Sequence, residues 1–247
     1  MIKGKKVVVV LPAYNAGKTL EKTYSEISFD IVDAVILVDD KSNDDTVQVA
    51  KKLGINTIIE HEKNLGYGAN QKTCYSKVLE MGADIIILLL LDYQYTPKLI
   101  PSMAHLVACD IYQVVLGSRI LGKGAIKGGM PIYKYFFNRV LTFIQNLLTG
   151  QKLSEYHTGY RAFSADVLRA IRYDRNSTGF IFDNEILCQV IYKGYAVGEI
   201  TCPAKYFQEA SSINFFQSVI YGIGVLNNSL KYRLSKMKLI NCRLYEV

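Results

Sequence analysis

The sequence predicts an α/β protein built on a doubly wound, mostly parallel sheet. Five short apolar runs alternate with stretches of helical spacing, which is the rhythm of repeated βαβ units. Most positions within a run are apolar, as in strands that are buried on both faces of a sheet. Two runs end abruptly in acidic residues, so we expect a ligand crevice at the carboxyl ends of the strands.

The expected elements alternate regularly along the first half of the chain. The predicted strands are residues 7–11, 34–38, 57–59, 85–91 and 114–116. The predicted helices are residues 18–27, 45–53, 69–81 and 97–107. Gly54 and Gly82 stand where two of these helices should end, because glycine readily takes the left-handed conformation that closes a helix. Each strand-to-helix junction is polar.

The pattern changes after Arg119. A glycine-rich loop ends at Pro131, a residue suited to the first turn of a helix. Apolar side chains then recur at helical spacing, which predicts an amphipathic helix within residues 131–150 whose apolar face is rich in aromatic rings. A second amphipathic helix with a basic tail follows near the C-terminus. We therefore expect one domain over residues 1–214 and a helical extension over residues 215–247.

Composition limits the class of partner. The 247 residues are 50% hydrophobic and 21% charged, enough apolar chain for the core of one large α/β domain. The net charge of +7 favours nucleic acid, a phosphate-bearing substrate or an acidic membrane surface. Nucleic acid is not expected, because no basic and aromatic recognition motif is present. The five cysteines form no Cys-x-x-Cys pair, which argues against disulfides and structural zinc and favours a reducing compartment.

Neither end of the chain nor its apolar runs predict a membrane span. The longest run, residues 85–91, has the length of a strand and falls well short of the roughly 20 residues that cross a bilayer. The short basic segment at residues 1–6 leads directly into the first strand, so no signal peptide is expected. We expect a cytoplasmic protein.

Polar motifs follow one another in a fixed order. The first three are Leu11-Pro12-Ala13-Tyr14-Asn15, Val38-Asp39-Asp40-Lys41-Ser42-Asn43-Asp44-Asp45-Thr46 and Asn64-Leu65-Gly66-Tyr67-Gly68-Ala69-Asn70. This series resembles family-2 glycosyltransferases, which have the Rossmann-like GT-A fold. Later segments look like the polyprenyl-phosphate (dolichyl-phosphate-type) sugar synthases of that family: Gly117-Ser118-Arg119, Thr158-Gly159-Tyr160-Arg161, Asn184-Glu185 and Gly198-Glu199-Ile200-Thr201-Cys202-Pro203. The resemblance covers residues 5–214.

The resemblance implies a nucleotide-sugar site at the strand ends. Its expected residues are Pro12, Tyr14, Asn15, Asp39, Asp40, Gly66, Gly68, Asp92 and Glu185. Pro12 and Tyr14 can wall a flat slot, and Asp40 is expected to accept from the base imide. As alternatives, Asp40 and Asp44 cap the next helix, and Glu185 orders a loop. The Gly66-x-Gly68 turn opens a helix whose amides attract phosphate, or it serves close packing.

The resemblance assigns a divalent metal to Asp92. Such enzymes hold Mg²⁺ or Mn²⁺ against the donor diphosphate with an Asp-x-Asp strand end, and oxygen ligands suit these hard ions. Asp92 matches the second acid and Gln94 a further ligand of the polyprenyl branch, whereas Leu90 replaces the first acid. One carboxylate and one amide hold an ion more weakly than two carboxylates, so the need for metal stays open. A metal-free contact of Asp92 with ribose or backbone is the alternative.

Catalytic and acceptor groups are also implied by the resemblance. Asp92, Arg119 and Glu155 are expected to be catalytic, and Arg119, Arg139 and His157 to meet the acceptor. A guanidinium suits a diphosphate or a sugar phosphate, and salt bridges are the alternative for both arginines. Glu155 would act as general base on a hydroxyl acceptor, whereas a phosphate acceptor, with a second pKa of about 6, hardly needs a base. Glu155 and His157 otherwise order their loop.

We therefore expect an inverting glycosyltransferase that moves a sugar from a nucleotide-diphosphate sugar to a polyprenyl phosphate. It would act as a peripheral protein on the inner face of the membrane. The apolar faces of the two amphipathic helices would contact lipid or a separate membrane-spanning partner, or they would be buried in the protein's own core. Transfer to a glycolipid or saccharide hydroxyl is the first alternative. A degenerate protein that binds nucleotide sugar without turnover is the second, and Leu90 favours it.

Overall fold

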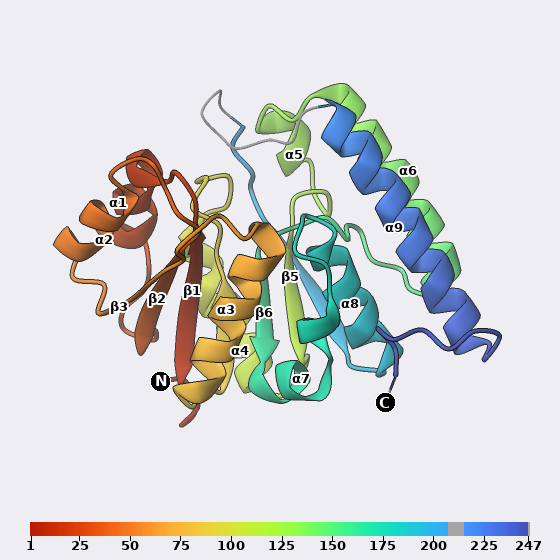
Figure 1. Ribbon diagram of the computed structural model, residues 1–247, viewed down its shortest axis with the longest axis horizontal. Coiled ribbons are helices and arrows are strands. Elements are labelled where there is room, and N and C mark those ends of the chain that lie inside the picture. The colour runs from red at the N-terminus through yellow and green to blue at the C-terminus, as the bar shows by residue number, and fades with distance from the viewer. Residues whose placement is uncertain (207–214, 247) are drawn as a thin grey trace.

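The computed structural model describes residues 1–206 and 215–246, and these residues form a seven-stranded sheet flanked by helices (Figure 1). The strands are β1 (Val7–Ala13), β2 (Ala34–Asp39), β3 (Thr57–Glu60), β4 (Ile85–Leu88), β5 (Val114–Ser118), β6 (Arg161–Ser164) and β7 (Val197–Thr201). They lie in the order β3-β2-β1-β4-β6-β5-β7. Only β6 runs antiparallel to its neighbours β4 and β5 within this sheet of the described chain, which confirms the predicted α/β, mostly parallel fold.

The helices cover the sheet from both sides. They are α1 (Gly17–Ser25), α2 (Thr46–Lys52), α3 (Tyr67–Glu80), α4 (Ile100–Ala108), α5 (Gly124–Lys127), α6 (Ile132–Thr149), α7 (Ala165–Ala170), α8 (Phe182–Tyr192) and α9 (Phe215–Lys236). Short 3-10 turns stand at Pro97–Leu99 and Tyr173–Arg175. The apolar run 85–91 is only partly a strand: β4 ends at Leu88, the Leu89 amide still donates to the carbonyl of Val10 in β1, and a turn begins at Leu91.

Strand β1 shows why a continuous apolar run is needed. Val7, Val9 and Leu11 pack into one core cluster with Leu20 of α1, whereas Val8 and Val10 point to the opposite cluster, which α3 and α8 complete. Successive side chains of a strand alternate between faces, so a strand with helices on both sides must be apolar at every position. The polar residues begin where this burial ends, at the carboxyl edge of the sheet.

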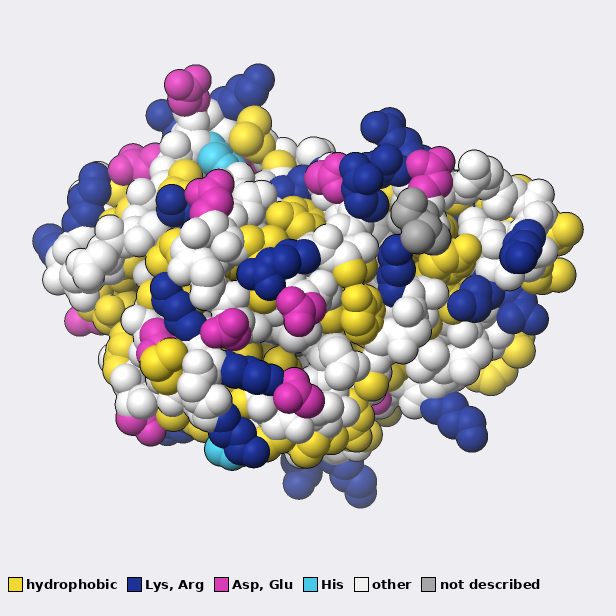
Figure 2. Space-filling view, turned by 90° about the horizontal axis from the view of Figure 1, so that it is seen from below, with side chains coloured by type: hydrophobic (Ala, Val, Ile, Leu, Met, Phe, Trp, Pro, Cys, Tyr) yellow, Lys and Arg dark blue, Asp and Glu magenta, His cyan; other side chains and the backbone are white. Residues whose placement is uncertain are grey.

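Helices α6 and α9 lie side by side at the end of the molecule farthest from α1 and α2 (Figure 1). Each buries polar side chains and exposes apolar ones. The buried residues of α6 are Asn138, Thr142, Gln145 and Thr149, and its most exposed apolar residues are Ile132, Phe136, Phe143 and Leu147. Exposed apolar residues of α9 are Phe216, Val219, Ile220, Ile223 and Leu230. In Figure 2 hydrophobic and basic side chains border one another at this end. The alternative of burial in the protein's own core is therefore wrong for these side chains.

Three further expectations concern a membrane span, disulfides and the domain boundary. Within residues 1–206 and 215–246 no helix combines the length and apolar character needed to cross a bilayer. The cysteines of the described chain are free thiols. The division between 1–214 and 215–247 stays a prediction, because residues 207–214 and 247 lie outside the described part of the chain.

Candidate active site

The acidic residues at the strand ends share one edge of the sheet. Strand β1 lies between β2, which leads into Asp40, and β4, which leads through a short turn to Asp92. The Thr19 hydroxyl of α1 donates to the carbonyl of Leu91 and so joins α1 to the turn after β4. Parallel strands place their carboxyl ends together, so the two carboxylates flank the same end of β1.

Asp39 and Asn15 hold two loops together. The Asp39 carboxylate is buried and accepts from the amide and the hydroxyl of Ser42, at 2.8 and 2.5 Å. The Asn15 amide donates to the Ser42 hydroxyl, and the Asn15 side-chain oxygen accepts from the amide of Asn43, both at 2.8 Å. Tyr14 beside them keeps 51% of its surface exposed, whereas Pro12 is partly buried. Tyr14 and Asn15 are thus the exposed members of this group.

Asp40 does not cap α2. Its carboxylate accepts from the amides of Leu65 and Gly66 at 2.8 Å each and lies 2.8 Å from Nδ1 of His61. Helix α2 is approached instead by Asp44, which accepts from the Thr46 amide at 3.1 Å. Hydrogen bonds to Thr46 and Gly17 hold the pKa of Asp44 below its ordinary value although burial opposes them. Asp44 therefore holds the first residue of α2, whereas the N-cap residue itself, Asp45, makes no side-chain capping hydrogen bond.

The Gly66-x-Gly68 turn packs closely against another loop. The amides of Gly68 and Ala69 donate to the carbonyl of Thr178, and a Cβ at Gly68 would lie 2.6 Å from the carbonyl of Ser177. The amides of Gly66 and Gly68 already have acceptors, Asp40 and Thr178, so these contacts favour the alternative in which the turn serves close packing. Glu185 accepts from the Ser177 amide at 2.6 Å, so its contact in this structure orders the same loop.

Asp92 is a half-buried carboxylate with few partners. Its Oδ1 accepts from the amide of Gln94 at 3.1 Å. Burial raises the pKa of Asp92, and the Gln94 amide and the Arg119 charge offset only part of that rise. A carboxylate held this way gains from a cation. Leu90 cannot supply a second carboxylate, and its side chain packs on Gly159, where an added Cβ would lie 2.4 Å from Cδ1.

The donor set at Asp92 fits a hard divalent ion only in part. No group of three or more acidic, histidine or cysteine side chains gathers anywhere in the described chain to hold a metal by itself. Asp92 and the buried Gln94 supply one carboxylate and one amide oxygen, which leaves most positions around Mg²⁺ or Mn²⁺ to diphosphate oxygens and water. Such an ion would enter together with the donor and neutralise its leaving diphosphate.

Arg119 and Glu155 form a buried ion pair. Glu155 is fully buried, and its carboxylate accepts from Nε of Arg119 at 3.0 Å, from the Arg119 amide at 2.9 Å and from Asn138 of α6 at 3.0 Å. The remaining guanidinium nitrogens reach Tyr206 and the carbonyl of His157, both at 3.0 Å. Burial raises the pKa of Glu155, but the charge and hydrogen bonds of Arg119 outweigh it and leave the pKa below its ordinary value.

These contacts change the role expected for Glu155. A carboxylate with a lowered pKa and with N–H donors on both oxygens is a poor proton acceptor. Glu155 instead positions Arg119, and Asn138 joins α6 to the pair. These contacts favour the alternative in which Glu155 orders its surroundings, and its use as a general base on a hydroxyl acceptor stays a prediction. The surface salt bridge considered for Arg119 is in fact a buried one.

The expected acceptor residues lie along one loop, where the Arg119 guanidinium donates to the carbonyl of His157, but their other contacts differ. Arg139 is exposed, donates to the carbonyl of Ser154 at 2.9 Å and lines an open groove of about 520 Å³ together with Lys152 and Glu199. His157 instead contacts the Tyr221 hydroxyl of α9 through Nδ1 at 2.9 Å. Burial lowers the pKa of His157 to about 4, so its ring is neutral near pH 7 and brings no positive charge to a phosphate.

Three further side chains of the site escaped the sequence reasoning. His61 has 8% of its side chain exposed and contacts Asp40. Asn138 holds Glu155, as described above. Lys134 lies one turn before Asn138 on α6; partial burial, and next the nearby Arg119 charge, lower its pKa, and within the described residues it makes no ion pair. Asn138 and Lys134 lie on α6, and the amphipathic spacing of that helix gives two faces without showing which one is buried.

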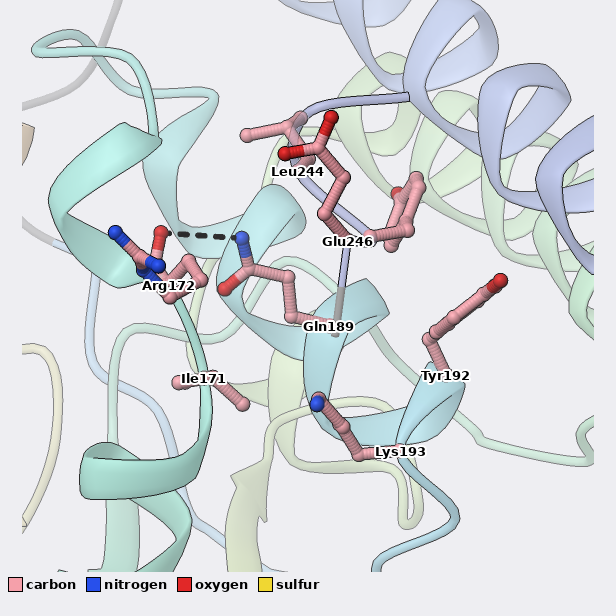
Figure 3. A pocket seen from close by; sticks show the side chains of 8 residues that line it. Ile171, Arg172, Gln189, Tyr192, Lys193, Leu244 and Glu246 are labelled. Atoms are coloured by element: carbon pink, nitrogen blue, oxygen red, sulfur yellow. Dashed lines mark hydrogen bonds between the residues drawn. The ribbon is translucent and has the colours of Figure 1, made fainter. Parts of the chain in front are cut away.

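A separate crevice lies far from these strand ends. It is lined by Ile171, Arg172, Gln189, Tyr192, Lys193, Leu244, Tyr245 and Glu246, between α8 and the C-terminal segment (Figure 3). Its volume is about 10 Å³, room for about one water molecule. Gln189 closes it by donating to the carbonyl of Arg172 at 3.3 Å (Figure 3). It is too small for a sugar or a nucleotide.

Comparison with known proteins decides the family. The model of "Glycosyl transferase family 2" matches residues 8–172, which include β1 to β6, Asp40, Asp92 and Glu155. The chain belongs to glycosyl transferase family 2. It is therefore a glycosyltransferase, as the ordered motifs predicted, and the resemblance to the polyprenyl-phosphate branch is confirmed by the relatives described next.

Two relatives of this family-2 glycosyltransferase are named for polyprenyl phosphates. UDP-N-acetylglucosamine-dolichyl-phosphate N-acetylglucosaminyltransferase of Methanococcus voltae is 27% identical over 94% of this chain and 98% of its own length. Undecaprenyl-phosphate mannosyltransferase of Micrococcus luteus is 24% identical over 90% and 92%. Among solved structures, glucosyl-3-phosphoglycerate synthase of Mycobacterium tuberculosis with Mn²⁺ and UDP-glucose superposes with a TM-score of 0.70 over 96% of this chain and 81% of that one. At 18% identity this last likeness supports the GT-A fold alone.

Proposed function

We propose that this glycosyltransferase moves a sugar, with inversion, from a nucleotide-diphosphate sugar to a polyprenyl phosphate at the cytoplasmic face of a membrane. The observation that carries the proposal is the arrangement of α6 and α9. The two helices pack side by side and expose apolar faces, while the buried polar face of α6 contacts Glu155 through Asn138. A lipid-linked acceptor that is anchored beside α6 would bring its phosphate close to the strand-end site. The names of the two relatives support the same acceptor class.

The chemistry of a phosphate acceptor suits the ion pair. A phosphate oxygen attacks the anomeric carbon while the bond from that carbon to the diphosphate breaks, and the nucleoside diphosphate leaves with its negative charge. The acceptor is largely ionised near neutrality, so no side chain needs to remove a proton. Positioning and charge stabilisation then carry the step. We assign charge stabilisation to Arg119 and Lys134, with Glu155 holding Arg119 in place, and the holding of a divalent ion against the diphosphate to Asp92.

A hydroxyl acceptor on a glycolipid or saccharide is the rival, because it would need a base. Supplying the purified chain with undecaprenyl phosphate, dolichyl phosphate or a saccharide acceptor, with labelled nucleotide sugars, separates the cases. The proposal expects label in a lipid phosphate and none in the saccharide. Transfer only to the saccharide would support the rival, and donor binding without nucleotide release from any acceptor would point to binding without turnover.

Membrane contact is tested on the exposed face of α6. Phe136 and Phe143 are 61% and 70% exposed, and the double variant Phe136→Ser/Phe143→Ser removes both rings. We expect it to sediment with phosphatidylglycerol vesicles at least about tenfold less than the parent, because two buried aromatic rings contribute several kcal/mol. Phe29→Ser in the α1–β2 connection, 50% exposed, is the matched control. Equal loss in both variants, or none in either, would contradict the proposed surface.

Lys134 is tested by removing its charge at similar volume. Lys134→Met should raise the KM for donor or lipid phosphate by about 10- to 100-fold, since a charge-assisted hydrogen bond contributes about 1.5–3 kcal/mol. Steady-state kinetics with each substrate varied in turn shows which phosphate it meets. Lys127→Met on the neighbouring α5, where the lysine is exposed, should change neither constant. Unchanged KM values in both variants would remove Lys134 from the site.

A further inference from the structure

The turn after β4 has a strained residue between its two candidate metal ligands. Tyr93 has a φ of 54°, in the left-handed region that a bulky side chain rarely adopts and that glycine or asparagine takes more readily. Asp92 precedes it and Gln94 follows it, and the Gln94 amide donates to Oδ1 of Asp92 at 3.1 Å. Backbone strain of this kind persists only where the surrounding structure maintains it. The contacts of Tyr93 therefore show what holds the turn in this shape.

Charged side chains, and not the apolar core, hold the ring of Tyr93. Its exposed fraction is 7%, yet it belongs to none of the three apolar clusters of the described chain, whereas Tyr95 does. Its hydroxyl donates to Oε1 of Glu26, directly after α1, at 2.5 Å. Nζ of Lys22 in α1 lies 4.2 Å from the ring centroid and Nζ of Lys205 lies 5.7 Å from it, distances at which a cation is attracted to an aromatic face. The side chain is therefore held both at its hydroxyl and over its ring.

The backbone of the turn is attached on two sides as well. Helix α1 holds the carbonyl of Leu91, as described above, and the Lys205 amide donates to the carbonyl of Gln94 at 3.1 Å. Tyr206, next to Lys205, accepts from Arg119 at 3.0 Å. The turn is thus fixed to α1 on one side and, on the other, to a segment that also contacts Arg119.

The two candidate ligands in this turn are left open. Within residues 1–206 and 215–246, neither the carboxylate of Asp92 nor the side-chain amide of Gln94 has a side-chain partner, although Gln94 is only 6% exposed. Leu90 cannot add a second carboxylate, so the hold on a diphosphate-bound ion depends on one carboxylate and one amide oxygen. Groups that are fixed in one conformation beforehand lose less entropy on binding. A rigid turn therefore matters more here than in a site with two carboxylates.

We propose that Tyr93 is a positioning residue, which holds Asp92 and Gln94 in the conformation that meets the donor diphosphate and its divalent ion. Through the contacts of its side chain with Glu26 and the two lysines, it gives the turn a rigidity that compensates for the carboxylate missing at Leu90. This inference rests on the proposed function, in which Asp92 serves a nucleotide-diphosphate donor, and adds a residue that acts through Asp92.

A double-variant cycle tests whether Tyr93 acts through Asp92. Tyr93→Asn removes the ring but keeps a residue that readily adopts a positive φ, and we expect it to lower kcat by about 10- to 100-fold with little change in the KM for lipid phosphate. In the Asp92→Asn background the same substitution should change kcat less than about threefold, because no carboxylate is left to position. Equal losses in the two backgrounds would show that Tyr93 only supports the fold and would overturn the inference.

Binding without turnover gives a second readout for Tyr93. Calorimetric titration of the full chain with Mn²⁺ and inorganic pyrophosphate measures the hold on the ion independently of base, sugar and lipid. We expect the dissociation constant to rise at least about fivefold in Tyr93→Asn, since a mobile turn loses more entropy on binding. An unchanged constant, or a wild-type chain that transfers sugar without binding this pair, would overturn the inference and leave the transferase proposal standing.

The hydrogen bond between Tyr93 and Glu26 can be removed from either end. Tyr93→Phe and Glu26→Ala should each lower kcat by about 3- to 10-fold, and the two together no further, because they remove one interaction. Glu21→Ala, exposed on the same helix, is the matched control and should keep the wild-type rate. If Tyr93→Asn fails to fold, these variants carry the cycle with Asp92→Asn. Wild-type rates in both would overturn the role of Tyr93, whereas a wild-type chain that transfers no sugar to lipid phosphate would defeat the proposed function itself.

Discussion

Glu155→Gln is expected to lower the free energy of unfolding by about 3–5 kcal/mol, because it leaves the buried Arg119 guanidinium without a counter-charge. The side chains of Arg119 and Glu155 are 11% and 0% exposed, and Nε of Arg119 lies 3.0 Å from Oε1. Water cannot take over the lost interaction at such a site. Urea unfolding of both proteins, followed by circular dichroism, measures the difference.

An exposed ion pair gives the matched control for Glu155→Gln. Arg169 and Asp166 are 3.1 Å apart with 52% and 88% of their side chains exposed, so Asp166→Asn should cost at most about 0.5 kcal/mol. Equal losses from the two substitutions would contradict the buried character of the Arg119 pair.

Lowering the pH should weaken this ion pair, because protonation of Glu155 removes its charge. Its folded pKa lies below its ordinary value, so its contribution is present above the unfolded pKa of about 4.3 and is lost as pH falls through the folded pKa. The gap in unfolding free energy between wild type and Glu155→Gln should therefore narrow in acid. A rate profile that keeps its shape in Glu155→Gln at a temperature where it is folded would agree with a positioning role. Loss of the acid-side limb of the profile in Glu155→Gln would instead restore the role of general base.

Much of the fold could be predicted from the sequence, because a strand that is buried on both faces of a sheet has a continuous run of apolar residues. The run at β1 has to be apolar at every position. The expected strands and helices of the first half occur with small shifts in their ends, except that the strand expected over residues 85–91 ends at Leu88. Strand β6 escaped notice because it inserts between β4 and β5 in the opposite direction. Its pairing joins residues distant in the sequence, and Arg161, fully buried there, donates to the carbonyls of Thr158 and Asp183.

The site could be predicted in its positions but not in its contacts. Motif order placed Asp40, Arg119 and Glu155 at the crevice, yet a one-dimensional pattern does not say which donors saturate a carboxylate. From its motif alone Glu155 could be a general base, but in the structure Arg119 and Asn138 donate hydrogen bonds to its carboxylate. The face of an amphipathic helix is equally ambiguous, because periodicity gives two faces and tertiary packing decides which one is buried. In α6 the buried face is the polar one.

Asp92→Asn is expected to lower kcat by about 100- to 1000-fold, in the range seen when one group that stabilises developing charge is removed. Asp92 is the carboxylate at the end of β4, and its alternative role as a ribose contact predicts a larger change in KM than in kcat. Initial rates at saturating donor and acceptor measure kcat, with the exposed Glu21→Gln of α1 as control. Activity above about a tenth of wild type would contradict a catalytic Asp92.

The pH dependence of metal use tests the same carboxylate. Burial raises the pKa of Asp92, and a protonated carboxyl does not bind a divalent ion, so Mn²⁺-dependent activity should fall in acid at a pH above the ordinary aspartate pKa of about 3.9. More Mn²⁺ should move that fall to lower pH, because ion and proton compete for one site. Leu90→Asp should tighten Mn²⁺ binding by restoring a second carboxylate, whereas Leu90→Asn reports the cost of losing the contact with Gly159. If Leu90→Asp and Leu90→Asn bind Mn²⁺ alike, the turn after β4 does not hold the metal, and the diphosphate is stabilised by Arg119 and Lys134 instead.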